Sequence, residues 1–303
     1  MKTAVITGSA GQDGTYLAEH LSQLGYTVVG LPRGGSVEIT AAESVTRFLQ
    51  ELQPVEVYHL AAYHHSAQDK LSNDLAVFRN STAVHCVATA NFLEAIRQVS
   101  SATRFFFAAS CHLFGAPPTP HQDETTPLNP DGLYGITKLT GVQLCRYYRQ
   151  KYQVFATVGI LYNHESPRRA PNFVTQKIVK AAVAIQAGRQ SRLTIGSLEA
   201  VVDWGFAGDY VDAMHRTLQL PDAGDFVIAS GASHRVGEFV EVAFQAVGLD
   251  WRKYVDVDPA LLRQSPRLPL VGDFSKLRRM TGWTPQTSFK ELVALMIAAE
   301  LRR

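Results

Sequence analysis

The sequence predicts an α/β fold with a doubly wound parallel sheet, followed by a smaller C-terminal region. Three observations carry this prediction. Short apolar segments alternate with helix-periodic segments, a glycine-rich turn joins the first such pair, and the alternation stops near residue 162. Continuous apolar strands between helices are typical of a parallel sheet with both faces covered.

The first five predicted elements follow one another closely. The β-branched run TAVIT (3–7) predicts a strand, and residues 14–25 place apolar side chains at helical spacing before they end in glycine. YTVVGL (26–31) predicts a second strand. Residues 41–52 predict a second helix, and VEVYHLAA (55–62) predicts a third strand.

The same alternation continues to residue 162. A long helical region is expected over roughly 74–98, and TRFFFAAS (103–110) predicts a fourth strand. Residues 134–152 predict a helix, and VFATVGILY (154–162) predicts a fifth strand. We therefore expect residues 1–162 to form one domain around a parallel sheet.

After residue 162 the pattern changes. NHESPRRAPN (163–172) is charged and contains two prolines, which predicts a loop. We expect residues 163–303 to form a second, smaller region of mixed α/β structure, from which a stretch around 203–230 returns to the main sheet. The helices expected beyond the loop are 173–188, 236–247 and 288–302, and the returning segments are 209–220 and 225–230.

Composition narrows the functional classes. The 303 residues are 46% hydrophobic and 18% charged, which supports a packed globular core. A net charge of +2 gives no signal for nucleic acid or a membrane surface. No apolar run approaches the roughly 18 residues of a membrane span, and the start KTAVITG is too short for a secretory signal. The cysteines lack metal-site spacing, so we expect a reduced, cytoplasmic protein without a metal.

A glycine-rich turn lies between the first predicted strand and helix. Gly8, Gly11 and Gly14 permit a tight turn in which backbone N–H groups approach a pyrophosphate at the helix N-terminus. The strand–turn–helix context makes this the dinucleotide turn of a Rossmann-type sheet. Gln12 and Asp13 lie within this turn, and Ala61 lies at the end of the third strand. We assign all three to the cofactor site by their position.

The second strand bears on the choice of dinucleotide. NAD-binding sheets carry an acidic residue there for the ribose hydroxyls. This chain has VVGLPRGGS, with Arg33 and no adjacent acid, and a guanidinium suits a 2′-phosphate. The sequence therefore favours NADP, with NAD as the alternative. A solvated surface role for Arg33 also stays open.

Tyr134 and Lys138 stand four residues apart in LYGITKL, on one face of a predicted helix. An ammonium group beside a phenol would favour tyrosinate and lower the pKa of the tyrosine. Such a pair can exchange a proton with a hydroxyl while a hydride moves to or from nicotinamide.

The glycine turn and the Tyr/Lys pair together resemble the extended short-chain dehydrogenase/reductase family. In that family a serine or threonine at the end of the fourth strand completes the catalytic set, and Ser110 stands there. Five segments extend the likeness to the GDP-mannose 4,6-dehydratase branch: TGSAGQDGTYLAEHL, QPVEVYHLAA, GILYNHESPRRAPNFVTQKI, DWGFAGDYVDAM and GWTPQTSFKELV. The resemblance implies a GDP-sugar substrate, GDP-mannose first of all, bound by residues 163–303, and a 4-keto-6-deoxy product.

Several residues have the chemistry to bind such a substrate. Arg168, Arg169 and Lys177 supply cationic donors for a diphosphate, and Asn163 can bond a hydroxyl or phosphate. For the two arginines, a structural role in salt bridges remains the alternative. The resemblance adds Arg263 as a diphosphate ligand, and His64 follows the third strand at the ligand-binding edge of the sheet.

The likeness also has gaps. His112 replaces the glutamate that abstracts the C5 proton in the branch, and Val202 and Phe206 replace an arginine and a histidine around DWG. Pro266 stands where an acidic residue is expected. The loop after the second strand is short, with Glu38 in the adenine-contacting position where an aspartate is expected, and this puts a tetramer in doubt. Helix 134–152 resembles the dimer helix of the family, so a homodimer is expected.

His112 is the predicted replacement base. An imidazole titrates near pH 6.5 and can serve as base and then as acid. If the chain stays extended after the strand, Ser110 and His112 share one face and Cys111 is a small buried residue on the other. Three functions stay open: a dehydratase that uses His112, a GDP-sugar epimerase or 4-ketoreductase, and an inactive sugar-nucleotide binding protein.

Overall fold

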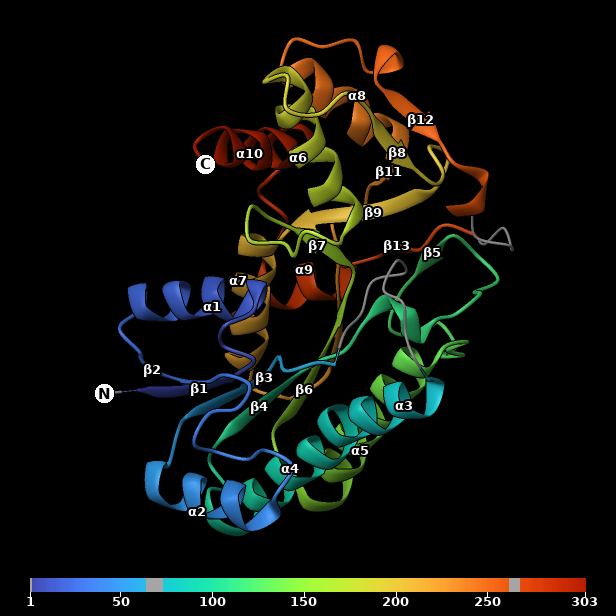
Figure 1. Ribbon diagram of the computed structural model, residues 1–303. Helices are drawn as coiled ribbons and strands as arrows, with labels where there is room; N and C mark the ends of the chain where they lie inside the picture. Colours follow the sequence, from blue (N-terminus) through green and yellow to red (C-terminus); the bar gives the residue numbers. More distant parts are fainter. Residues whose placement is uncertain (1, 64–72, 262–267) are drawn as a thin grey trace.

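The computed structural model describes residues 2–63, 73–261 and 268–303. The chain forms a large α/β body, with the second region lying over one edge of its sheet (Figure 1). Within the described residues, six strands form the central sheet in the order β10-β6-β4-β3-β1-β2, and every neighbouring pair is parallel. These strands are β1 Thr3–Thr7, β2 Thr27–Leu31, β3 Glu56–His59, β4 Arg104–Ala108, β6 Ala156–Leu161 and β10 Asp225–Ile228.

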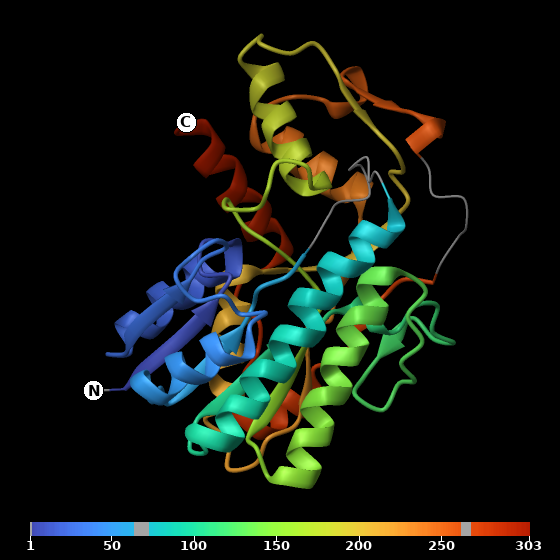
Figure 2. The same cartoon turned by 60° about the horizontal axis from the view of Figure 1, so that its bottom comes forward.

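Helices cover both faces of the sheet, as Figures 1 and 2 show from two sides. The side chains of β4 explain why, because Phe106 packs with α1 and α7 on one face while Phe105 and Phe107 pack with α4 and α5 on the other. The parallel, doubly wound sheet is thus confirmed. The covering helices are α1 Gln12–Gln23, α7 Ala207–Leu218 and α9 Ser275–Thr281 on the first face, and α2 Ala42–Leu52, α4 Ala88–Val99 and α5 Leu133–Tyr152 on the second.

The helix expected over 74–98 is interrupted. It consists of α3 Asp74–Thr82, a π-helical turn over Ala83–Val87, and α4. The wide turn places the buried side chain of His85 toward α5. The π-helical turn and α5 approach closely at Gly141 of α5, where a Cβ would lie 2.8 Å from the carbonyl oxygen of His85.

The second region has its own apolar core. Its helices pack around Trp204, Phe239 and Met296. The expected loop at 163–172 begins instead with a strand, because residues 163–165 pair in parallel with β9 and align His164 with Gly205. The elements here are α6 Val174–Gln186, α8 Val236–Ala246, α10 Phe289–Leu301, β7 Asn163–Glu165, β8 Leu193–Ile195, β9 Val201–Phe206, β11 Ser233–Arg235 and β12 Val255–Val257, with short helical turns at Trp251–Lys253 and Pro259–Leu261.

Two further connections tie the regions together. β5 (His121–Gln122) pairs with β13 (Val271–Gly272) beside the end of the main sheet. Asp203 of β9 is buried and accepts hydrogen bonds from the backbone N–H groups of Ser230, Gly231 and Gly272. In the part of the chain that the structure describes, no helix is both long and apolar enough to cross a membrane.

Candidate active site

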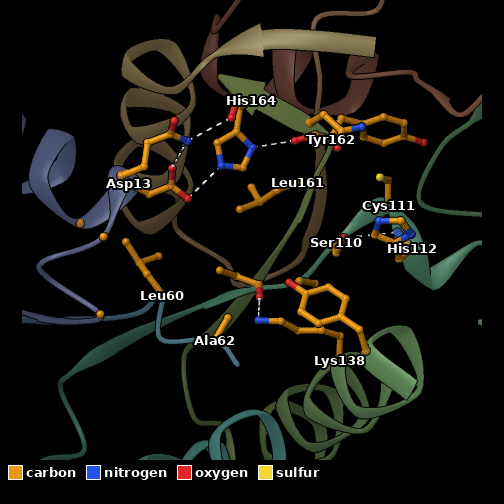
Figure 3. A pocket seen from close by; sticks show the side chains of 18 of the residues that line it. Asp13, Leu60, Ala62, Ser110, Cys111, His112, Lys138, Leu161, Tyr162 and His164 are labelled. Atoms are coloured by element: carbon orange, nitrogen blue, oxygen red, sulfur yellow. Dashed lines mark hydrogen bonds and ion pairs between the residues drawn. The ribbon is translucent and has the colours of Figure 1, made fainter. Parts of the chain in front are cut away.

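A cavity lies at the carboxyl edge of the parallel sheet (Figure 3). Segments far apart in the sequence line it: the glycine turn, the ends of β3 and β4, the start of α5 and residues 161–164. Open α/β sheets bind their ligands at this edge. The predicted site residues that line the cavity are Gly8, Gly11, Gln12, Asp13, Gly14, Ser110, His112, Tyr134, Lys138, Asn163 and Arg169.

The glycine turn leaves no room for a side chain at Gly8 or Gly14. Gly8 has a φ of +70°, and a Cβ there would lie 3.0 Å from the backbone of Ala61. A Cβ on Gly14 would lie 2.4 Å from the carbonyl oxygen of Gly8. Gly11 is the N-cap of α1, and the first N–H groups of a helix have no partner within it. This cradle fits a pyrophosphate.

The side chains of Gln12 and Asp13 contact the segment that follows β6. Oδ2 of Asp13 lies 2.8 Å from Nε2 of His164, and Nε2 of Gln12 donates to the carbonyl oxygen of His164 at 3.0 Å. Ser166 Oγ donates to Gln12 Oε1 at 2.8 Å. A cofactor at this turn would therefore meet the backbone of residues 12 and 13.

The Asp13–His164 pair shifts the pKa of both partners. Burial acts to raise the pKa of the Asp13 carboxyl, but the charge and hydrogen bond of His164 outweigh burial and lower it. Burial likewise acts to lower the pKa of His164, and Asp13 outweighs it, so that this pKa is raised. The pair therefore favours the carboxylate–imidazolium form.

Tyr134 and Lys138 are brought together at the start of α5, as their spacing predicts. Lys138 is buried, its Nζ donates to the carbonyl oxygen of Ala108 at 2.6 Å, and it lies 5.8 Å from the centroid of the Tyr134 ring. Burial lowers the pKa of Lys138 to about 7. The expected lowering of the tyrosine pKa is wrong for this structure, because burial raises the pKa of Tyr134 above its usual range.

Ser110 and His112 meet at the end of β4, although not by extended alternation. Residues 111–113 form a 3₁₀ turn that Ser110 caps, its Oγ accepting from the N–H of His112 at 3.3 Å. This local bond bends the chain after Ser110. The ring of His112 still lies edge-on to that of Tyr134, with 6.1 Å between centroids. Cys111 is buried, and burial raises the pKa of its thiol to about 12, which fits an inert residue.

Sequence reasoning missed His85, which supports the tyrosine from the π-helical turn. Its Nδ1 lies 2.9 Å from Thr137 Oγ1, and its Nε2 accepts from the N–H of Tyr63 at 3.2 Å. Its ring meets that of Tyr134 edge-on at 5.2 Å. The sequence carries no signal for the π turn, since one extra residue in a long helix leaves no distinctive periodicity.

The predicted substrate arginines both form salt bridges. Arg168 pairs with Glu19 at 2.7 Å and lies over the ring of Tyr16. Arg169 lies over the ring of Phe173, with its Nε 3.2 Å from Glu165 Oε2, and it also lines the cavity. Lys177 is half-buried on α6. Arg263 and His64 lie outside the described residues.

The predicted nucleotide-specificity residues lie on the turn after β2. Arg33 is exposed there. The carboxylate of Glu38 accepts from the N–H of Thr40 at 3.0 Å and from its hydroxyl at 2.6 Å, so it caps its own turn. Ala61 donates its N–H to Thr7 Oγ1 at 3.1 Å, directly beside Gly8. Over the residues that the structure places, no group of three or more His, Cys, Asp or Glu residues could hold a metal ion.

Known proteins resemble this chain over most of its length. The family described as GDP-mannose 4,6 dehydratase matches residues 35–296. GDP-mannose 4,6 dehydratase 2 of Arabidopsis thaliana is 38% identical over 99% of this chain and 87% of that protein. The human GDP-mannose 4,6 dehydratase is 34% identical over 98% of this chain and 91% of that protein.

Solved structures share the fold at lower identity. RMD from Pseudomonas aeruginosa, complexed with NADPH, superposes with a TM-score of 0.85 at 20% identity, and each chain is covered completely. A dTDP-glucose 4,6-dehydratase from Bacillus anthracis in complex with NAD gives a TM-score of 0.84 at 16% identity, over 100% of this chain and 97% of that one. These likenesses support the Rossmann-type assignment.

Proposed function

This chain belongs to the GDP-mannose 4,6-dehydratase family, and from that membership we propose that it is a nicotinamide-dependent lyase that converts GDP-mannose into its 4-keto-6-deoxy derivative. One observation carries the proposal for this chain's own residues. Ser110, His112, Tyr134 and Lys138 converge on the cavity that the glycine turn also lines. Hydride chemistry at a sugar carbon needs this combination of groups.

We assign NADP to the glycine turn. The backbone of residues 8–14 would hold the pyrophosphate, and Tyr134 and Lys138 would face the nicotinamide end. The exposed Arg33 suits a 2′-phosphate, and the carboxylate of Glu38 is turned to Thr40. A bound nicotinamide would supply the hydride transfer, out from C4 and back to C6, and its oxidised ring would add a positive charge to the cavity. NAD is the alternative.

Tyr134, Ser110 and Lys138 act at C4. Tyr134 would act as the tyrosinate: its oxygen takes the proton of the C4 hydroxyl, while Ser110 Oγ donates a hydrogen bond to the C4 oxygen. Burial raises the pKa of Tyr134 in the chain alone, and the positive charge of a bound oxidised nicotinamide would lower it. Lys138 is buried against the carbonyl of Ala108, so its charge is fixed beneath the tyrosine. The resulting 4-keto group acidifies the C5–H bond.

His112 acts at C5 and C6. Its imidazole lies at the cavity beside Tyr134 and is exposed, so it can take the C5 proton and then protonate the departing C6 hydroxyl. The same histidine supports a second candidate, a GDP-sugar epimerase or 4-ketoreductase, because an imidazole can also serve enolisation without loss of the C6 hydroxyl. An inactive binding protein is disfavoured, since it has no need for four convergent polar groups.

We assign the sugar nucleotide to the region after residue 162. Asn163 and Arg169 line the cavity and are the nearer ligands. Arg168 is directed to Glu19, and Lys177 lies farther along on α6, so their roles as diphosphate ligands depend on rearrangement. Arg263 and His64 complete the proposed set.

We further propose a homodimer formed through α3 and α5. These helices lie side by side and expose apolar side chains, among them Phe78, Ile136 and Tyr147. Exposed apolar side chains on two neighbouring helices support an interface. The short turn after β2 supports a dimer over a tetramer.

One incubation tests the assignment. The purified protein, supplied with NADP⁺, is mixed with GDP-mannose, and the products are separated by chromatography and identified by mass spectrometry. A dehydratase gives a product lighter by one water, with no net change in NADPH absorbance at 340 nm. An epimerase gives an isomer of unchanged mass, a reductase consumes NADPH only with a keto sugar, and a binding protein turns nothing over.

A further inference from the structure

Two residues of the glycine turn are bonded directly to the strand that opens the second region. Gln12 and Asp13 are the first residues of α1, and His164 lies in β7, which Tyr162 separates from the end of β6 (Figure 3). We call Gln12, Asp13, His164 and Ser166 the turn–strand junction. Two of its members belong to the glycine turn and two to the segment after β6. Gln12, Asp13 and His164 line the cavity.

The geometry fixes the charge of His164. Its Nδ1 lies 2.6 Å from the carbonyl oxygen of Tyr162, and its Nε2 lies 2.8 Å from Oδ2 of Asp13. Both partners are oxygen acceptors when Asp13 is ionised, so both ring nitrogens must donate. The ring is then an imidazolium, paired with the carboxylate of Asp13.

The amide of Gln12 completes the junction. Its Nε2 donates to the carbonyl oxygen of His164 and to Oδ1 of Asp13, at 3.0 and 3.1 Å, and its Oε1 accepts from Ser166. The His164 ring also packs on Tyr210 of α7, with 4.8 Å between centroids. The groups that face His164 are thus Asp13, Tyr210 and, through its charge, Arg169. Three of these polar contacts span the boundary between the turn and the strand: Gln12 with His164, Gln12 with Ser166, and Asp13 with His164.

The pair also removes a charge conflict. An unpaired carboxylate at residue 13 would stand beside the helix N-terminus that receives a pyrophosphate and would repel it. The imidazolium cancels that charge. A shift of β7 would therefore change the charge beside the dinucleotide turn. A shift of the turn would in the same way displace the strand that carries Asn163 and leads to Arg169.

We propose that Asp13 and His164 are positioning residues that couple the two binding sites, so that a dinucleotide on the turn and a sugar nucleotide on the far side of the cavity bind with positive cooperativity. The inference rests on the proposed function. Each ligand binds beside one side of the junction and would favour its paired arrangement, and this favours binding of the other ligand. By linkage the coupling is reciprocal, and we expect a factor of about ten, within the usual range of about 5–150.

The test measures binding and needs no turnover. The dissociation constant of NADPH is measured by its fluorescence with and without saturating GDP, and that of GDP is measured by calorimetry with and without NADPH. The wild-type chain should bind each ligand about ten times more tightly in the presence of the other. Asp13→Asn and His164→Gln should each reduce that factor to near one, and the double variant should lose no more than either single variant.

The chain offers a matched control. Glu19→Gln breaks the Arg168–Glu19 pair, which also joins α1 to the residues after β7 but is exposed. Any effect of the released Arg168 on GDP binding should be the same with and without NADPH, so the coupling factor should be unchanged. Thermal unfolding of each variant checks its fold, and if one variant does not fold, the other single variant carries the test.

Four outcomes overturn the inference. Independent binding of NADPH and GDP to the wild type would end it while leaving the proposed function standing. Weaker NADPH binding by Asp13→Asn, by the same factor with and without GDP, would make Asp13 a direct ligand. Equal loss of coupling in Glu19→Gln would show that any bond between the segments suffices. Failure of the wild type to bind either ligand would overturn the proposed function, and the inference with it.

Discussion

The ammonium group of Lys138 donates a hydrogen bond to the carbonyl oxygen of Ala108, with 2.6 Å between Nζ and O. This bond ties α5 to the end of β4, two residues before Ser110, and therefore fixes two parts of the proposed catalytic set relative to each other. It also holds a cation in a buried position, where a charge is costly.

That burial predicts how stability changes with pH. Lys138 has a pKa of about 7 in the folded chain, against about 10.4 for an unperturbed lysine. Between these values the unfolded chain binds more protons, so the contribution of Lys138 to the free energy of unfolding rises with pH. Chemical denaturation at about pH 6.5, 8 and 9.5 should show the wild type gaining stability relative to Lys138→Met. Parallel curves would contradict the lowered pKa of Lys138, and Lys290→Met, at an exposed lysine, is the control.

Tyr134→Phe should abolish turnover and spare binding. The phenol oxygen is the proposed proton acceptor at C4, and losing a general base typically costs about 10²–10⁴-fold in kcat. The ring contacts with His85 and His112 remain in the variant. Steady-state kinetics with GDP-mannose should show the loss, while the dissociation constant of NADPH stays within about twofold. A variant that keeps a tenth of the wild-type kcat would remove Tyr134 from the reaction.

Two substitutions at His112 should have opposite effects on dehydration. His112→Glu restores the residue that the family uses as the base, and it should preserve or raise formation of the 4-keto-6-deoxy product. His112→Phe keeps a ring beside Tyr134 but removes the acid and base, and kcat should fall by about 10²-fold or more. Mass spectrometry of the products measures both. Complete loss in a folded His112→Glu variant would count against the placement of His112 at C5.

Arg33→Ser should change the choice of cofactor. A charge-assisted hydrogen bond contributes about 1.5–3 kcal/mol, so removing the guanidinium should weaken NADPH by about 10- to 100-fold. The affinity for NADH, which lacks the 2′-phosphate, should change by less than about twofold. Fluorescence titration with both dinucleotides gives the ratio, and Arg47→Ser on the neighbouring helix α2 is the control. An equal loss for the two cofactors would refute the assignment.

Ile136→Glu should convert the proposed dimer into a monomer. Ile136 is 42% exposed near the start of α5, on one of the two helices of the proposed interface, and a carboxylate there would be buried in the dimer. Light scattering coupled to size exclusion should report half the mass of the wild type. Leu24→Glu, at a similarly exposed leucine after α1, should leave the mass unchanged. A monomeric wild type would contradict the proposed interface.

The regular part of the fold was predictable because its signals are local. Each central strand is a short apolar run between turn residues, and β1 begins and ends where TAVIT does. The glycine turn and the Tyr134–Lys138 pair were also recognisable, since three glycines between a strand and a helix, or two residues one helical turn apart, fix their own geometry.

The missed features depend on distant partners or on a balance of energies. Residues 163–165 form a strand only because β9 lies beside them. His164 reads as one residue of a charged loop until Asp13 is placed next to it. Burial raises the pKa of Tyr134, and the ammonium group of Lys138 donates to a carbonyl oxygen; spacing alone gives neither the burial nor that orientation.

The π-helical turn over Ala83–Val87 joins α3 to α4 and changes the direction in which side chains point around the helix axis. An added residue rotates everything after it by about 100° around the axis relative to an uninterrupted α-helix. Before the turn, Leu75 and Phe78 face outward, and after it Phe92 and Ile96 face the sheet. Deleting one residue of the turn would therefore rotate α3 relative to α4. The chain could then keep either the proposed dimer surface of α3 or the packing of α4 on the sheet, but not both.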